Sequence, residues 1–456
     1  MFTRSIRRMA LGAVLACSTA LGASAQSLTD ALVDAYKNSE LIEQSRALLR
    51  SADEDVAIAT SRLRPILDYS ATYGYSDSLT SEGDSAAIGV TASLLLYDFG
   101  RSRLRIEANK ELVLATREAL RDTEQDVLLN GVSAFLNVRL ADDNVELRRN
   151  NVRVITEQLR AAQDRFEVGE VTRTDVAQAE ARLAEANANL TSALGQQASA
   201  REVYRAVVGS FPNALAPPPP SPTIPGSVEE AVSIAERTHP SILQARHNVR
   251  ASEIAAEVAE RAIMPSASAQ ASVTRNIRDA LDDSTDSSIG LTVTGPIYQG
   301  GGLSASYRQA LASVDNARAG LNQSVLVIRQ SVGIAWADIL VTRATIDATR
   351  RQVEAAEVAF EGVTEEARLG ARTTLDVLDA EQDVLDARTS LLSAEISAVQ
   401  AVYDLLQSMG LMTVEYLGLP VPTYDPEVYY NAVSNAPATS TRGAALDRVL
   451  QSIVRD

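Results

Sequence analysis

Apolar residues recur every seven positions over long stretches of the second half of this chain. From residue 311 to residue 363 they fill two positions of nearly every heptad, and Arg318 is the only charged residue in that series. Such a seam is typical of a long helix that packs as a coiled coil. It predicts a helix from about 304 to 367, roughly 95 Å long at 1.5 Å per residue. A turn at Gly370 then leads to a second helix with an apolar residue every seven positions from 378 to 406.

The first half of the chain carries the same arrangement. A helix is predicted from about Arg101 to Phe166, followed by a turn at Gly169 and a second helix from Thr172 to Val208. Shorter helices are predicted to open the two halves, over residues 28–61 and 228–262. Aromatic residues make up only 4% of the chain, which suits helices that pack closely side by side.

Between the short and long helices, apolar and small polar residues alternate with a period of two. The four segments are Leu67–Ser76, Ile88–Leu96, Ala267–Thr274 and Ile289–Ile297. This period predicts β-strands that pair as two hairpins, over residues 66–97 and 266–298. About ten residues of tilted strand also cross the core of a bilayer. A half-buried hairpin in a soluble domain is the alternative, but the small polar residues on the second face favour a membrane barrel.

The two halves are copies of one another in sequence. Residues that recur at an offset of 200 include Ser27, Ile42 and Pro65, which return as Ser227, Ile242 and Pro265. From Ile88 onward the offset is 201, so that Gly169, Asp175 and Val176 return as Gly370, Asp376 and Val377. A period this long indicates two equivalent halves of one architecture. The predicted parts are a first repeat (26–211, with a long helical hairpin over 101–209), a proline-rich linker (212–226), a second repeat (227–411, with its hairpin over 303–409) and a C-terminal tail (412–456).

The first residues carry the pattern of an export signal. Three arginines precede an apolar run and the tripeptide Ala23-Ser24-Ala25, which predicts a secretory signal peptide over residues 1–25. A lipoprotein signal ending at Cys17, the only cysteine, is the competing interpretation, although Leu15 fits that motif poorly. The formal net charge of −17 argues against a nucleic-acid partner.

The number of strands determines the predicted assembly. Four strands cannot close a barrel, and open strand edges are not tolerated in lipid. Two chains would give eight strands, whose inward side chains fill the bore, whereas three chains give twelve strands with room for a channel. The predicted fold is therefore mainly α with membrane β: a homotrimer in which a 12-stranded β-barrel continues into a long barrel of coiled-coil helices.

The chain resembles the TolC family of outer-membrane efflux and secretion ducts over essentially its whole length after the signal. The segments that carry the resemblance are Arg165–Gly169 with Thr174–Val176, Pro296–Gly301, and Gly370–Ala380. The resemblance implies strands in the cell outer membrane and helices that extend across the periplasm. It also implies partners at the helical tips, namely a periplasmic adaptor protein and an inner-membrane transporter. The tip residues expected to dock the adaptor are Val168, Gly169, Glu170, Leu369, Gly370 and Ala371.

Charged residues gather beside the two predicted turns. Asp376 and Asp379 lie three residues apart on one helix face, Arg372 precedes Asp376 by four residues, and Asp175 is the counterpart of Asp376 in the first repeat. Three-fold repetition would turn each into a ring, and carboxylate rings favour cations. The resemblance implies a periplasmic gate at these residues, which we expect Arg372 to close through partners near Asp175 and Thr174. Where the family archetype has a tyrosine in this network, this chain has Ala367. An ordinary solvated helix face remains the alternative.

The sequence contains no pattern that indicates an enzyme or a metal site. His239 and His247 are the only histidines, stand eight residues apart, and have no cysteine nearby. No nucleophile–base pair is visible, so we expect no catalytic residues, cofactor or metal. The predicted function is a passive exit conduit of a tripartite efflux pump or a type I secretion system. A periplasmic structural coiled coil without a pore is the alternative, and it leaves the amphipathic strands unexplained.

Overall fold

The computed structural model describes residues 25–78, 81–278, 281–422 and 424–434. Cys17 and nearly all of the predicted signal peptide lie outside the described residues, as does the end of the predicted C-terminal tail. The described chain forms two compact units. One unit contains residues up to 40 together with 124–233 and 330–421, and the other contains residues 41–123, 234–329 and the chain after 421.

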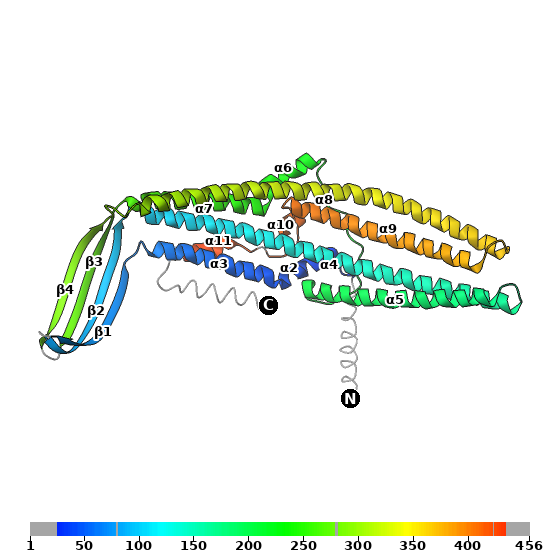
Figure 1. The fold of residues 1–456 in the computed structure, drawn as a ribbon, viewed down its shortest axis with the longest axis horizontal. Helices are drawn as coiled ribbons and strands as arrows, with labels where there is room; N and C mark the ends of the chain where they lie inside the picture. The colour runs from blue at the N-terminus through cyan, green and yellow to red at the C-terminus, as the bar shows by residue number, and fades with distance from the viewer. Residues whose placement is uncertain (1–24, 79–80, 279–280, 423, 435–456) are drawn as a thin grey trace, which may run out of the picture. The chain divides into compact units, whose positions relative to one another are not determined.

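Two long helical hairpins dominate the chain, as the heptad pattern predicts (Figure 1). The first hairpin consists of α4 (Arg101–Glu167) and α5 (Arg173–Val208), and the second of α8 (Gly302–Arg368) and α9 (Thr374–Ser408). Helices α4 and α8 each contain 67 residues, which corresponds to about 100 Å. Buried alanines recur every seven residues along both shorter partners: Ala179, Ala186 and Ala193 in α5, and Ala387, Ala394 and Ala401 in α9. These small side chains let the paired helices approach closely.

Shorter helices open each repeat. The first repeat begins with α2 (Leu28–Asn38) and α3 (Glu40–Ser61), and the second with α6 (Val228–Thr238), α7 (Pro240–Glu260) and the 3-10 helix η1 (Arg261–Ile263). Pro240 occupies the first turn of α7, where a missing N–H costs nothing. After α9, the chain forms α10 (Val414–Leu417) and α11 (Pro426–Val433). Helix α11 and the residue before its cap pack on α3 and α4, where Tyr424 and Tyr430 contact the buried cluster of Leu49, Val56 and Val113.

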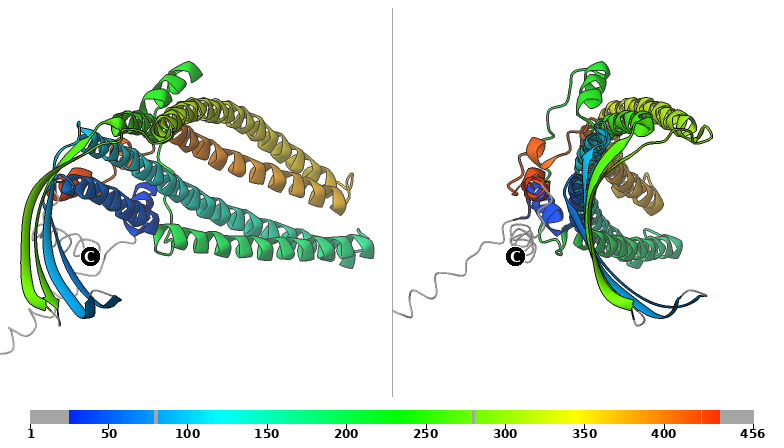
Figure 2. Two further views of the ribbon diagram at one scale, coloured as in Figure 1. Left: turned by 60° about the vertical axis from the view of Figure 1, so that its left-hand side comes forward. Right: turned by 90° about the vertical axis from the view of Figure 1, so that its left-hand side faces the viewer.

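The four strands form one antiparallel sheet in the order β1-β2-β3-β4, which is visibly curved (Figure 2). The strands are β1 (Ile66–Ser78), β2 (Ser81–Tyr97), β3 (Ser266–Arg278) and β4 (Leu281–Thr294). The sequence duplication extends to the pairing of backbones. Leu67 pairs with Ala92 in the first hairpin, and Ala267 pairs with Val293 in the second, so the same offsets of 200 and 201 relate both partners.

The two faces of the sheet differ sharply in chemistry. Because directly paired residues of an antiparallel ladder point to the same face, the register shows on which face of the sheet each side chain lies. One face carries mainly apolar residues, among them Leu67, Tyr69, Tyr73, Ile88, Val90, Val273, Ile289, Leu291 and Val293. The other face carries mainly small polar residues, among them Ser70, Thr72, Thr91, Ser93, Gln270, Ser272, Thr274, Ser288 and Thr292. The charged residues on the apolar face include Asp84, opposite Tyr75, and Arg275, opposite Ile88. They lie toward the hairpin end of the strands, where the guanidinium of Arg275 pairs with Asp283 at 3.1 Å.

Candidate functional site at the helical tips

Both long hairpins turn through the same backbone geometry. Gly169 and Gly370 adopt positive φ values of 81° and 78°, a conformation that glycine adopts without strain. At the first tip, the N–H of Gly169 donates to the carbonyl of Phe166 at 3.0 Å, and the N–H of Glu170 donates to that of Arg165 at 2.9 Å. The second tip repeats both bonds, from Gly370 to Ala367 at 3.1 Å and from Ala371 to Glu366 at 2.8 Å. This pair of backbone hydrogen bonds is the Schellman motif, in which a helix ends at a left-handed glycine.

The tips expose apolar side chains at their ends. Val168 and Leu369 are the last residues before the two glycines, and they are 72% and 84% exposed. Glu170 and Ala371, just beyond the glycines, are also exposed. The six predicted docking residues thus form two small exposed knobs, each built around a left-handed glycine with a large apolar residue before it.

Asp175 and Asp376 each belong to a capping box at the start of a helix. The hydroxyls of Thr172 and Thr373 accept the N–H of Asp175 at 3.3 Å and of Asp376 at 3.2 Å. In return, the carboxylates accept the N–H of Thr172 at 2.8 Å and of Thr373 at 2.9 Å. Hydrogen bonds from the Thr172 side chain and backbone hold the pKa of Asp175 below its usual range. Bonds from the Thr373 backbone and side chain do the same for the pKa of Asp376.

These caps give the two aspartates a local role that the sequence analysis missed. The signal was available, because Thr172–Asp175 and Thr373–Asp376 both fit the Thr-x-x-acidic pattern of a capping box. The cap does not remove the charge. It keeps both carboxylates ionised and fixes where they point.

Arg372 forms an ion pair with Glu366 across the second tip. Its Nε donates to Oε2 of Glu366 at 2.8 Å, and both side chains are about half exposed. Glu366, and secondarily Asp376, raise the pKa of Arg372. The partner within this chain is therefore a residue that the sequence analysis did not name, at the end of α8. Thr174, which was expected near Arg372, lies exposed on the first turn of α5.

Asp379 joins the two hairpins. Its Oδ1 accepts a hydrogen bond from Nη2 of Arg182 on α5 at 2.5 Å, and the same arginine also reaches Glu185 at 3.2 Å. Beneath this pair, Leu378 packs in a buried cluster with Ile155, Ala179 and Ala186 of the first hairpin. Nothing in the spacing of the sequence marks Arg182, because its partner lies 197 residues away.

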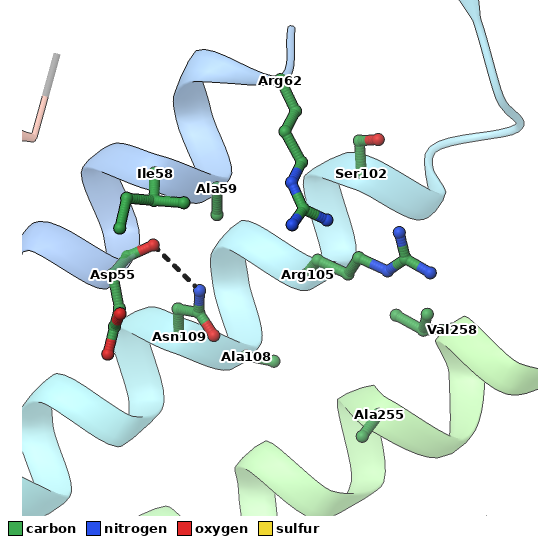
Figure 3. Close-up of a pocket in the computed structure, with 10 residues that line it drawn as sticks. All are labelled: Asp55, Ile58, Ala59, Arg62, Ser102, Arg105, Ala108, Asn109, Ala255 and Val258. Carbon is green, nitrogen blue, oxygen red and sulfur yellow. Dashed lines mark hydrogen bonds between the residues drawn. The ribbon is translucent and has the colours of Figure 1, made fainter. Parts of the chain in front are cut away.

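The described part of the chain also holds a cavity away from the tips. It measures about 490 Å³ and lies between α3, α4 and α7, with Arg62, Arg105 and Asp55 on its wall (Figure 3). At this wall, Nδ2 of Asn109 on α4 donates to the backbone carbonyl of Asp55 on α3 at 3.1 Å. Its lining also includes Ser102 and contains neither a histidine nor a cysteine.

The two histidines have separate structural partners. Nδ1 of His239 accepts the N–H of Ser241 and caps α7, and Nδ1 of His247 lies 2.8 Å from a carboxylate oxygen of Glu111. Across the described ranges, no group of three or more His, Cys, Asp or Glu residues is placed to hold a metal ion.

Known proteins share this architecture. The sequence profile of the family described as "Outer membrane efflux protein" matches residues 31–210 and 231–411, one match in each repeat. The outer membrane efflux protein BepC of Brucella suis is 37% identical over 441 residues, which cover 95% of this chain and 96% of BepC. The outer membrane protein TolC of Escherichia coli K12 is 27% identical over 392 residues, which cover 79% of this chain and 78% of TolC. The solved open state of the Neisseria gonorrhoeae MtrE outer membrane channel has a TM-score of 0.73 at 21% identity, and the match covers 85% of this chain and 89% of MtrE. This chain belongs to the outer membrane efflux protein family.

Proposed function

We propose that three copies of this chain form a passive duct through which an efflux pump or a type I secretion system exports its substrate. The observation that carries the proposal is the four-stranded sheet, which has an apolar face, a polar face and two outer edges that no other strand among the described residues pairs with. In a bilayer the edges must be paired. Three chains would supply twelve strands, with the apolar face toward lipid and the polar face toward a water-filled bore.

The helices support the same assembly. Helix α8 carries apolar side chains that are more than half exposed in the single chain, including Leu326, Ile334, Leu340 and Val341. A stretch of this helix also has the length and composition of a membrane span, with a mean hydropathy of 1.5. These four residues lie one or two positions after the heptad residues 325, 332 and 339, so they form a second apolar strip beside the heptad seam. At 67 residues, α8 is far longer than the roughly 20 residues that span a bilayer, which favours neighbouring helices of the assembly as the cover of this strip.

The energy for transport would come from partners. We infer that the exposed knobs at Val168–Glu170 and Leu369–Ala371 dock a periplasmic adaptor, which links the duct to an inner-membrane transporter. The capped carboxylates and Arg372 stand beside these knobs, where three chains would converge. Asp376 and Asp379 would then form rings of carboxylates that favour cations, and Arg372 would shift between Glu366 and an acidic neighbour to open and close the entrance.

The alternative is a structural coiled coil of the periplasm without a pore. It requires no trimer and no conduction. Outer-membrane fractions analysed in unboiled and boiled SDS gels separate the two proposals, because a closed membrane barrel migrates as a heat-sensitive trimer. Purified protein added to a planar bilayer should also give discrete conductance steps. A protein that stays monomeric in detergent by analytical ultracentrifugation and gives no steps would overturn the duct.

A further inference from the structure

The outer edges of the sheet are long, regular and apolar on one side. On β4, Ile289, Leu291 and Val293 are 88%, 67% and 66% exposed, and on β1, Tyr73 is 75% exposed. If the chain works in the proposed trimeric duct, β4 of one subunit must pair with β1 of the next. A shift of two residues along this seam would keep the same faces, so the faces alone do not determine the register.

The internal duplication supplies the register. The pairings of the two hairpins superimpose under the offsets of 200 for β1 to β3 and 201 for β2 to β4: Gly74 opposite Ser85 returns as Thr274 opposite Asp286. The seam between β2 and β3 is where the strands of one repeat meet those of the other within the chain. The seam between β4 and the next subunit's β1 has the same relationship to the repeats.

We propose that β4 pairs with β1 of the partner subunit in the register that β2 and β3 adopt within the chain. Within the chain, Val90 lies opposite Val273 and Thr91 lies opposite Ser272. The same offsets place Leu291 opposite Tyr73 of the partner subunit and Thr292 opposite Thr72 of the partner subunit. The ladder continues on either side, with Ile289 opposite Tyr75 of the partner subunit and Val293 opposite Ala71 of the partner subunit.

The chemistry of each pair agrees with this register. Apolar residues meet apolar residues on the lipid face, and Thr292 meets a threonine on the polar face, as Thr91 meets a serine inside the chain. Cross-strand pairs of both kinds stabilise a sheet. The register also brings Gly290 opposite Gly74 of the partner subunit, and a Cβ built on either glycine in the single chain meets no atom within 4 Å. The ladder would end at Thr294 because Pro296 has no N–H to donate.

Disulfide trapping tests the register directly, because Cys17 is the only native cysteine. The test protein is the full chain with Cys17→Ala, Thr72→Cys and Thr292→Cys, oxidised with copper phenanthroline in outer membranes. Directly opposed residues lie about 4.5–5.5 Å apart between Cα atoms, within the reach of a disulfide. Inside one chain the two positions are three strand spacings apart sideways, roughly 14 Å, and eight residues apart along the strands, because Thr72 is level with Ser284 of β4, so they cannot bridge. The expected product is a covalent trimer in boiled, non-reducing gels.

Three matched variants make the result specific. Thr292→Cys with Ser70→Cys, and Thr292→Cys with Gly74→Cys, test the registers shifted by two residues; both pairs are diagonal in the proposed register, roughly 7–8 Å apart, and should link at least tenfold less. Thr91→Cys with Ser272→Cys is the internal equivalent, and it should form a disulfide within one chain without oligomer bands.

The outcomes separate the register from the proposed function. Efficient covalent trimer from the Thr72 pair alone supports the register. Stronger linking by the Ser70 or Gly74 pair would overturn the register and leave the trimer standing. An internal control that oxidises while no intersubunit pair links, in protein that still runs as an unboiled trimer, would overturn the β4–β1 seam. A monomer in unboiled gels before any oxidation would overturn the trimeric duct itself.

Discussion

Asp53 is a carboxylate that the fold holds in an unfavourable place, and replacing it should make the chain more stable at neutral pH. The residue lies on α3, is 0% exposed, and has no hydrogen bond to either carboxylate oxygen among the described residues. Leu49 and Val56, on the same helix, belong to the buried apolar cluster that α11 covers. Burial raises the pKa of Asp53 to about 6 from 3.8, with Glu54 adding to the shift and the charge of Arg117 opposing it.

Because the pKa of Asp53 is raised in the folded chain, the free energy of unfolding depends on pH. The carboxyl of Asp53 holds its proton more tightly in the folded chain than in the unfolded chain. The stability that this proton gives the folded chain is therefore fully present below pH 4 and is lost as the pH rises through about 6. A pKa difference of this size is equivalent to about 3 kcal/mol per chain. An asparagine side chain at this position would carry no charge but would still bury an amide, so we expect Asp53→Asn to gain about 1–2 kcal/mol at pH 7.5 and to gain nothing at pH 4.

The assay is denaturation of the detergent-solubilised protein, followed by the helical circular dichroism signal at pH 4 and pH 7.5. From pH 4 to pH 7.5, the free energy of unfolding should fall further for the wild type than for Asp53→Asn. Asp55→Asn, an exposed change of the same charge two residues away, controls for the loss of a negative charge on α3. Equal pH dependence in wild type and Asp53→Asn would refute the reasoning, as would an equal loss of stability in the asparagine variant at both pH values.

Three further predictions concern the pore. Arg372→Ser should raise single-channel conductance in planar bilayers and make cells more sensitive to large antibiotics, because it removes the cation proposed to close the entrance; wild-type conductance at both low and high salt would contradict this. Asp376→Asn together with Asp379→Asn should weaken cation preference in reversal-potential measurements while the trimer persists, since the amide oxygen of an asparagine at 376 can still accept the N–H of Thr373 in the capping box; unchanged selectivity would remove these residues from the ion path. Val90→Arg, on the apolar face, should destabilise the folded barrel by about 2–4 kcal/mol near the bilayer midplane, whereas Thr91→Arg on the polar face should not; urea titration in lipid vesicles compares the two, and equal costs would mean that the faces are wrongly assigned.

Several features of the site were accessible from sequence because they are local. The glycines of the two tips, their equivalence and the nearby aspartates follow from a repeat that is visible at offsets of 200 and 201. The capping boxes were accessible in the same way, because a Thr-x-x-Asp pattern acts within one turn of helix. The pairing of Arg372 with Glu366 was not, because a flexible side chain beside several carboxylates selects its partner by geometry rather than by spacing.

The sequence by itself determined the parts of this protein: heptads specify long helices, two-residue alternation specifies strands with two unlike faces, and the duplication makes the halves equivalent. These are short-range patterns, since each reflects which side of a helix or strand meets apolar surroundings. Only the tertiary structure decided which distant residues meet. It placed Arg182 against Asp379, inserted Leu378 into the core of the first hairpin, and covered the apolar cluster beside Asp53 with a segment from the far end of the described chain. Such contacts depend on how whole helices dock, and no periodicity along the chain records which helices those are.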